Sequence, residues 1–422
     1  MELKGEKERI RIDALNEQVW ALLRLGRQDE GLEKVEEGIR LINELEEKEG
    51  EHKDKERIAN LLNNKGNVYY QKGELDHALD YYKMSLVIRE EIGDKLDIAA
   101  SLNNLGIVYR MKGELGPALN KFKRSLSLKE EIDNKQSIAA SLNNIGDLYQ
   151  ELGALEMALG FLKQGLALRE EIGNKLEIAY SLYSLIIVTI DLEEFQQARD
   201  YLSTLQLINK QEENKRVDLC NRLAEALILK VSKRRKNLAK AEEILNEIVE
   251  NAEKEIISHR LTIQALINLS ELLLEELLST SEEEILEEVE EKVDKLMEIA
   301  KEQQSYSLLT ESYLLKSQLA LVRLDLEKAR NLLIQAQVIA EEKGLEKLAR
   351  KISNEHDQLL EQLDLWEELI AKDVSIAERV KVANLEELVG WMARKREIEV
   401  DEQEEDPIMI RSEEHTSELQ SR

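Results

Sequence analysis

Leu62-Asn63-Asn64-Lys65-Gly66, Leu102-Asn103-Asn104-Leu105-Gly106 and Leu142-Asn143-Asn144-Ile145-Gly146 are copies of one pentapeptide, spaced 40 residues apart. A degenerate fourth copy follows at Leu182-Tyr183-Ser184-Leu185-Ile186. Repetition at a fixed period of this length is typical of a solenoid, in which each unit buries its apolar face only against its neighbours. The pattern therefore favours a long binding surface over a closed catalytic pocket.

Each copy contains two amphipathic stripes with helical spacing. In residues 58–97 the first stripe includes Gly66 and Tyr69, and the second includes Ala78 and Tyr82, with a glycine break between them. A bulky side chain at Gly66 or Ala78 would push the two helices beyond close-packing distance. The same slots are filled in the next two copies by Gly106, Tyr109, Gly113, Ala118 and Phe122, and by Gly146, Tyr149, Gly153, Ala158 and Leu162.

This order of small and aromatic residues resembles the tetratricopeptide repeat, or TPR. The resemblance covers at least residues 56–205. A unit longer than the usual ~34 residues, with a Leu-Asn-Asn core, is similar to the repeats of kinesin light chains and of related adaptor and bacterial peptide-sensor proteins. The resemblance implies an all-α fold: a right-handed superhelical solenoid of antiparallel helix pairs.

The period divides the chain into five expected segments. We predict a degenerate TPR-like pair with an acidic link in 1–55, four extended repeats in 56–215, and irregular TPR-like hairpins with a C-terminal cap in 216–396. Residues 397–410 read as an acidic linker and the start of a further domain, as in similar archaeal multi-TPR proteins. Residues 411–422 resemble a translated sequencing adapter and are excluded from fold reasoning.

Composition excludes several classes of function. The 422 residues carry a formal net charge of −28, which disfavours nucleic acid and anionic membranes as partners. The single cysteine, Cys220, allows no internal disulfide and reads as a small buried apolar residue, with a reactive thiol as the alternative. Without an apolar signal region at the N-terminus or a membrane-length apolar run, we expect a cytoplasmic protein.

The paired asparagines are the strongest candidates for contact with a partner. The first helix of a TPR lines the concave groove, and an amide can donate to and accept from a peptide main chain. In the similar families such asparagines form a ladder along bound peptide. The alternative is that one asparagine per repeat bonds to a neighbouring helix end and holds the superhelix together. The predicted partner-binding residues are Asn63, Asn64, Asn67, Tyr70, Asn103, Asn104, Arg110, Asn143, Asn144, Asp147 and Tyr183.

No pattern in the sequence indicates catalysis. The five histidines are isolated, so we expect no metal, and we expect no cofactor. The one dense basic run, Lys233-Arg234-Arg235-Lys236, is read as a solvated helix end, with contact to an anion or acidic partner as the alternative. We predict a non-enzymatic scaffold or adaptor that binds a protein or peptide segment. The second hypothesis is a peptide- or ligand-sensing regulator whose output domain follows Pro407.

Overall fold

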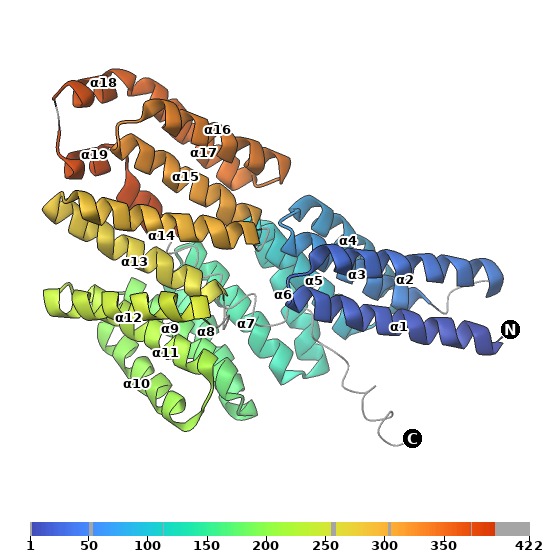
Figure 1. The fold of residues 1–422 in the computed structure, drawn as a ribbon. Coiled ribbons are helices and arrows are strands. Elements are labelled where there is room, and N and C mark those ends of the chain that lie inside the picture. The colour runs from blue at the N-terminus through green and yellow to red at the C-terminus, as the bar shows by residue number, and fades with distance from the viewer. Residues whose placement is uncertain are drawn as a thin grey trace. The chain divides into compact units, whose positions relative to one another are not determined.

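Helices account for every regular element in the described part of the chain, which confirms the all-α prediction (Figure 1). The computed structural model describes residues 2–49, 54–112, 114–254, 259–302, 305–372 and 374–392. The segments predicted for 397–410 and 411–422 lie outside these ranges. The segment boundaries proposed from the sequence therefore stay predictions.

The chain forms two compact units, one reaching Ile145 and the other starting at Gly146, so that α7 (Lys135–Glu151) contributes to both. The first unit contains α1 (Glu2–Arg24), α2 (Gln28–Glu49), α3 (Lys55–Gln71), α4 (Leu75–Ile92), α5 (Lys95–Met111) and α6 (Leu115–Ile132). The second contains α8 (Leu155–Ile172), α9 (Lys175–Asp191), α10 (Phe195–Gln211), α11 (Lys215–Val231), α12 (Arg235–Lys254), α13 (His259–Thr280), α14 (Glu283–Glu302), α15 (Tyr306–Val322), α16 (Leu326–Glu342), α17 (Glu346–Glu361), α18 (Leu363–Lys372) and α19 (Ile376–Val382).

Short turns join each helix to the next, and their residues explain where the helices end. Gly93 has φ of +85°, a left-handed conformation that costs glycine little, and it ends α4. Asp94 follows and caps α5, because its side chain accepts from the N–H groups of Leu96 and Asp97 at 2.9 and 3.0 Å. Asn174 caps α9 in the same manner. The residues that cap the helices therefore recur with the repeat, as the packing residues do.

The small residues of the repeat allow the helices of a pair to approach closely. A Cβ atom built on Gly66 would lie 2.7 Å from the ring of Tyr82, and one on Gly106 would lie 2.6 Å from the ring of Phe122. Ala78 is fully buried on the second helix of the pair. These contacts confirm that the pattern small–aromatic–alanine–aromatic is a packing pattern of α3 with α4 and of α5 with α6.

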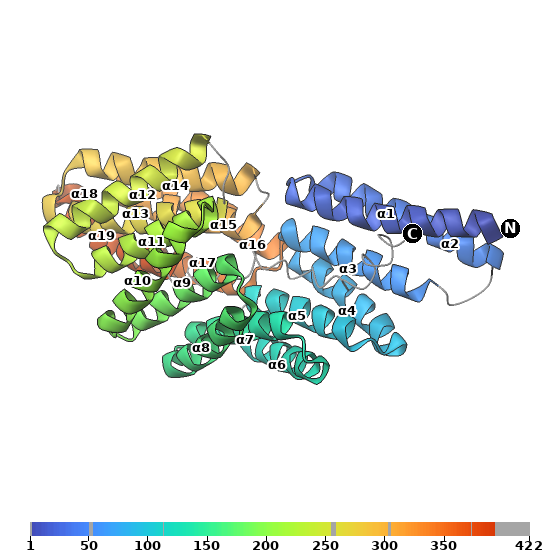
Figure 2. The same cartoon turned by 90° about the horizontal axis from the view of Figure 1, so that it is seen from below.

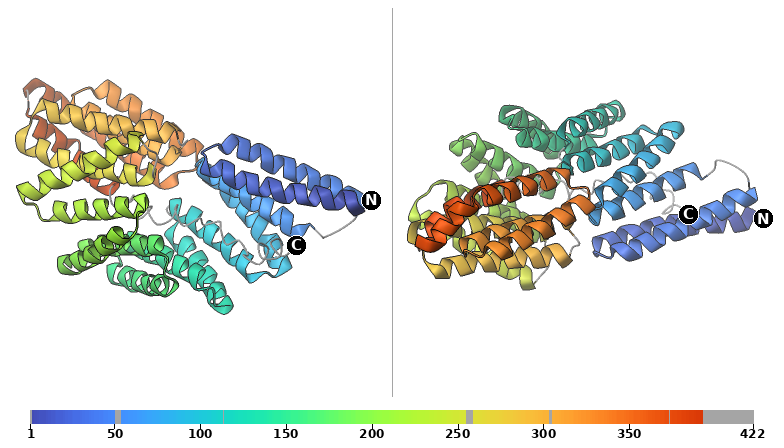
Figure 3. Two further views of the ribbon diagram at one scale, coloured as in Figure 1. Left: turned by 60° about the horizontal axis from the view of Figure 1, so that its bottom comes forward. Right: turned by 90° about the horizontal axis from the view of Figure 1, so that it is seen from above.

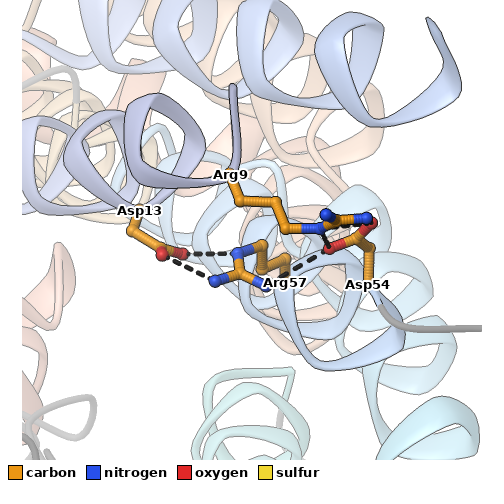
Figure 4. A network of polar contacts seen from close by, with 4 residues as sticks. All are labelled: Arg9, Asp13, Asp54 and Arg57. Atoms are coloured by element: carbon orange, nitrogen blue, oxygen red, sulfur yellow. Dashed lines mark hydrogen bonds and ion pairs between the residues drawn. The ribbon is translucent and has the colours of Figure 1, made fainter. Parts of the chain in front are cut away.

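An ion-pair network attaches the N-terminal helix to α3 in the first unit (Figure 4). The guanidinium of Arg57 donates to both carboxylate oxygens of Asp13 at 2.8 Å, and also to Asp54 at 3.2 Å. Arg9 donates to the same oxygen of Asp54, Oδ1, at 3.0 Å, and to Oδ2 at 3.3 Å. A bidentate pair fixes geometry as well as charge, so α1 is held in one register against α3.

The second unit continues the pattern of packed helix pairs with less regular turns. Adjacent helices α9, α10 and α11 contact one another, and α15 contacts both α14 and α16 (Figures 2 and 3). Cys220 on α11 is fully buried, which confirms the prediction for its side chain, and Trp366 on α18 is also buried. Among the described helices, none combines the length and apolar character needed to cross a membrane.

Candidate functional site

The paired asparagines form a ladder of side-chain hydrogen bonds between the first helices of successive repeats. Asn104 on α5 donates from Nδ2 to Oδ1 of Asn63 on α3 at 3.0 Å, and Asn144 on α7 donates to Asn103 on α5 at 2.9 Å. In each rung the second asparagine of one pair donates to the first asparagine of the preceding pair. The amides therefore connect neighbouring helices of the first unit.

The ladder reaches one repeat further toward the N-terminus than the sequence pattern indicated. Asn64 donates to Asn16 on α1 at 3.0 Å. These two residues are 48 apart, because the acidic link between α2 and α3 lengthens the repeat. The signal that could have found Asn16 is an asparagine on the apolar stripe of the degenerate repeat, once that insertion is allowed for.

The burial of these side chains differs from the expectation that they face an open groove. All six asparagines of the three pairs are at most 6% exposed. Five of them lie in the seam between successive first helices, because each of these five amides bonds to an asparagine on the neighbouring helix. In the first two pairs both asparagines thus have an inter-repeat role, whereas the structural alternative assigned such a role to one asparagine per repeat.

In the repeat formed by α3 and α4, further hydrogen bonds between side chains extend the asparagine ladder. The hydroxyl of Tyr82 donates to Oδ1 of Asn67 at 2.6 Å, and Nδ2 of Asn67 donates to Oδ1 of Asn64 at 3.2 Å. In the next repeat Ile107 occupies the slot of Asn67, and Phe122 that of Tyr82. Oδ1 of Asn104 is consequently buried without a donor among the described residues. Oδ1 of Asn144 is in the same state.

The other predicted residues differ in burial and in the helix that carries them. Tyr70 is half-buried at the end of α3, and Arg110 is buried near the end of α5. Asp147 and Tyr183 are buried in the second unit, on α7 and α9. Contact of any of these residues with a partner stays a prediction.

A second ladder, missed by the sequence analysis, connects the second helix of a repeat to the first helix of the next. Its cations are Arg89, Lys129 and Arg169, which are 40 residues apart and buried. Each donates to a serine 12 residues further on: Arg89 to Ser101 at 2.9 Å, Lys129 to Ser141 at 2.7 Å, and Arg169 to Ser181 at 2.6 Å. The period of the basic residues could have revealed these rungs.

The three cations differ in their environment. The carboxylate of Asp97 lies 3.7 Å from the guanidinium of Arg89, and the carboxylate of Glu177 lies 3.7 Å from that of Arg169. Ser137 occupies the corresponding slot beside Lys129. Burial lowers the pKa of Lys129 from its usual value to about 7. Lys129 is therefore a buried amine that lacks the counter-ion of its equivalents.

The described residues hold no cluster of histidine, cysteine and carboxylate side chains of the kind that binds a metal ion. The basic run Lys233–Lys236 is exposed, as the sequence analysis expected. Its position differs in one respect: α11 ends at Val231 and α12 begins at Arg235, so Arg235 and Lys236 lie in the first turn of a helix. Cations are disfavoured there by the helix dipole.

Comparison with known proteins places the chain among TPR proteins. Residues 51–348 match the family described as the MalT-like TPR region. No curated protein sequence matches the chain significantly.

Several solved structures resemble parts of the fold. The apo form of RapI aligns with a TM-score of 0.49 and 16% identity over 71% of this chain and 97% of its own. Kinesin light chain TPR-like repeats from Podosopora anserina align with a TM-score of 0.42 and 16% identity over 49% and 100%. A STAND signal-transduction ATPase with a TPR sensor from Pyrococcus horikoshii gives 0.45 and 19% over 63% and 40%. At these identities the likeness concerns the repeat fold.

Proposed function

Because this chain belongs to the MalT-like TPR family, we propose that it is a protein-interaction adaptor that binds an extended or helical segment of a partner protein along the first helices of its repeats. The bound element is a peptide segment, and the adaptor itself performs no chemistry. The cytoplasmic location expected from the sequence stays a prediction.

The observation that carries this proposal is the pair of unsatisfied acceptors on Asn104 and Asn144. A buried acceptor without a donor costs roughly 1–3 kcal/mol, whereas the equivalent atom of Asn64 is satisfied by Asn67. A main-chain N–H of a bound segment is a donor of the required kind, and it recovers this energy whatever the sequence of the segment. The two acceptors belong to consecutive repeats, on α5 and α7. They could therefore contact successive parts of one segment.

The same asparagines favour a second candidate, the peptide- or ligand-sensing regulator. Their donors already connect α5 to α3 and α7 to α5. If a segment reaches the buried acceptors by parting these helices, binding would change the spacing of the repeats. Such a ligand would bind the protein with parted helices more tightly than the protein with closed helices. This difference in affinity is what a regulatory response requires.

The test compares partner binding by two triple variants, Asn63→Ala/Asn103→Ala/Asn143→Ala and Asn64→Ala/Asn104→Ala/Asn144→Ala. A partner is first recovered from native lysate with the unmodified chain and its affinity is measured by calorimetry. The second variant removes the acceptors of Asn104 and Asn144, so the loss of two hydrogen bonds should weaken binding by roughly 1–3 kcal/mol. The first variant tests whether the other asparagine of each pair also contacts the partner. Circular dichroism at the assay temperature establishes that each variant is folded.

Asn120→Ala is the matched control, because Asn120 is exposed on α6. Its affinity should equal that of the unmodified chain. Unchanged affinity in both folded triple variants would mean that the partner binds elsewhere and that the ladder is purely structural. A change in the distance between α3 and α7 on binding, measured between spin labels, supports the regulator, and an unchanged distance supports the plain adaptor.

A further inference from the structure

An apolar pocket of about 210 Å³ lies within the second unit, where α9, α10 and α11 meet. Its apolar walls come from Ile190 at the end of α9, from Phe195 and Ala198 on α10, and from Ile228 and Val231 on α11. Arg199 and Ser232 provide the polar part of the lining. The volume suits one large apolar side chain.

The pocket exists because this repeat departs from the pattern of the earlier ones. The fully buried alanine of the second helix is followed by Leu79, Leu119 and Leu159 in the three preceding copies, and here by Arg199. Leu79 is buried, whereas Arg199 is exposed. Phe195 is 38% exposed, although Leu75 in the equivalent slot is fully buried. The slot that holds a buried leucine at position 79, and half-buried leucines at positions 119 and 159, is therefore occupied here by a cation at the edge of an apolar cavity.

Arg199 lines this cavity, and a run of cations follows another lining residue in the chain. Ser232 lines the pocket, and the basic run begins at the next residue, Lys233. Within the described ranges, Arg199, Arg234, Arg235 and Lys236 form no ion pair, although the chain as a whole carries an excess of carboxylates. Lys233 lies 3.6 Å from Glu275. Two of these cations also occupy the first turn of α12, where the helix dipole opposes them.

We propose that this pocket is a docking site for an acidic segment of a partner protein that carries one large apolar anchor. The anchor, a leucine, phenylalanine or tryptophan, fills the cavity between α10 and α11. Flanking aspartate or glutamate side chains pair with Arg199 and with the Lys233–Lys236 run. This site is separate from the asparagine ladder and does not depend on it.

The apolar cavity distinguishes this ligand from a nucleic acid. A phosphate backbone would pair with the cations but would leave the cavity empty, and the strongly negative chain would repel a long polyanion. A short acidic peptide has less charge to be repelled, and burial of its anchor adds apolar contact. Central apolar anchors with a charged rim are the usual arrangement at protein interfaces.

The experiment uses labelled decapeptides with a central leucine, phenylalanine or tryptophan flanked by Asp and Glu, by Asn and Gln, or by Lys. Binding to the full chain is followed by methyl NMR of isoleucines, with Ile190 and Ile228 as reporters. At least one acidic peptide should bind with Kd below about 1 mM and shift both signals. Raising the salt concentration should weaken that binding.

Arg199→Leu is the decisive variant, because it restores the residue of the other repeats and so fills the cavity while keeping the fold. It should weaken binding of the acidic peptide at least ~10-fold. Arg234→Glu/Arg235→Glu/Lys236→Glu should weaken it as much. Lys83→Glu/Lys163→Glu/Lys175→Glu makes the same charge change at exposed positions elsewhere and should leave binding intact.

Three outcomes would overturn the proposal. The first is that no acidic peptide shifts the Ile190 and Ile228 signals up to about 1 mM. The second is that Arg199→Leu, shown to be folded by its melting curve, binds the peptide as the unmodified chain does. The third is that a single-stranded oligonucleotide displaces the peptide at equal concentration, which would assign the basic run to phosphate.

Discussion

Asn104 Nδ2 lies 3.0 Å from Asn63 Oδ1, and this bond connects two helices across 41 residues of sequence. Both side chains are almost completely buried. A buried polar pair contributes little net stability, but a misaligned pair leaves donors and acceptors without partners. The asparagine ladder therefore specifies the register in which one repeat stacks on the next.

Removing one rung should be costly, whereas removing an exposed asparagine should not. Asn103→Ala leaves Nδ2 of Asn144 without its acceptor, since that donor bonds to Asn103 at 2.9 Å. We expect a loss of ~1–3 kcal/mol in the free energy of unfolding, measured by urea denaturation. Asn120→Ala on the exposed side of α6 should stay within ~0.5 kcal/mol. Equal effects of the two substitutions would contradict the structural role of the rung.

Transplanting the polar chain of one repeat into the next should satisfy the acceptor of Asn104. Ile107→Asn and Phe122→Tyr recreate the arrangement in which Tyr82 donates to Asn67 and Asn67 donates to Asn64. Each single change buries a polar group with an incomplete set of partners and should destabilise the fold by ~1–3 kcal/mol. The double variant should recover ~1 kcal/mol or more relative to the sum, measured in a double-mutant cycle.

The cycle has a simple negative result. If the two changes add within ~0.5 kcal/mol, the two new side chains do not interact. The Tyr82–Asn67–Asn64 chain would then be a local feature of α3 and α4 that the next repeat cannot accommodate.

The repeat's helices could be predicted because their determinants are local. Gly66 and Ala78 are small because the two helices of one pair approach closely at these positions. The same requirement recurs in each copy with the 40-residue period. The role of the asparagines was harder to predict. An asparagine on the first helix of a repeat fits the sequence pattern equally well whether it faces a binding groove or lies between two repeats. Only the placement of α5 against α3 puts Asn104 beside Asn63.

The pocket was beyond sequence reasoning for a related reason. Arg199 reads as an ordinary exposed residue of an amphipathic helix, and only alignment with Leu79, Leu119 and Leu159 shows that a filling side chain is missing. Whether the space beside Arg199 is filled depends on α11, and the sequence of α11 no longer follows the 40-residue repeat pattern. The basic run was visible in the sequence, but its place beside the cavity was not.

Overpacking the centre of a helix pair tests the register of the repeats. Ala118 is fully buried on α6, so Ala118→Leu should force neighbouring side chains from their positions and cost ~1–3 kcal/mol. Glu130→Leu on the same helix replaces an exposed side chain and should be nearly neutral. Melting temperatures of the two variants measure the difference, and an equal decrease in both would contradict the assigned packing.

Lys129 should make the stability of the protein depend on pH above neutrality. Its amine donates to Ser141 at 2.7 Å and lacks the carboxylate that Asp97 and Glu177 provide to Arg89 and Arg169. Its pKa is about 7 in the folded chain, lowered by burial, against an ordinary value of 10.5. Between these values the unfolded chain binds more protons than the folded one, so the free energy of unfolding rises with pH.

We therefore expect the free energy of unfolding of the unmodified chain to rise as pH increases from about 7 towards 10.5. Below that window Lys129 is protonated in both states and should add no pH dependence. The gain should be on the order of a few kcal/mol at most, since one pKa unit corresponds to about 1.4 kcal/mol. Lys129→Met removes the titrating group and should flatten the curve, so the difference between the two urea-denaturation series isolates Lys129. Lys129→Arg/Ser137→Asp restores the pairing of the neighbouring repeats and should also flatten it. A slope that persists unchanged in Lys129→Met would assign the pH dependence to other groups.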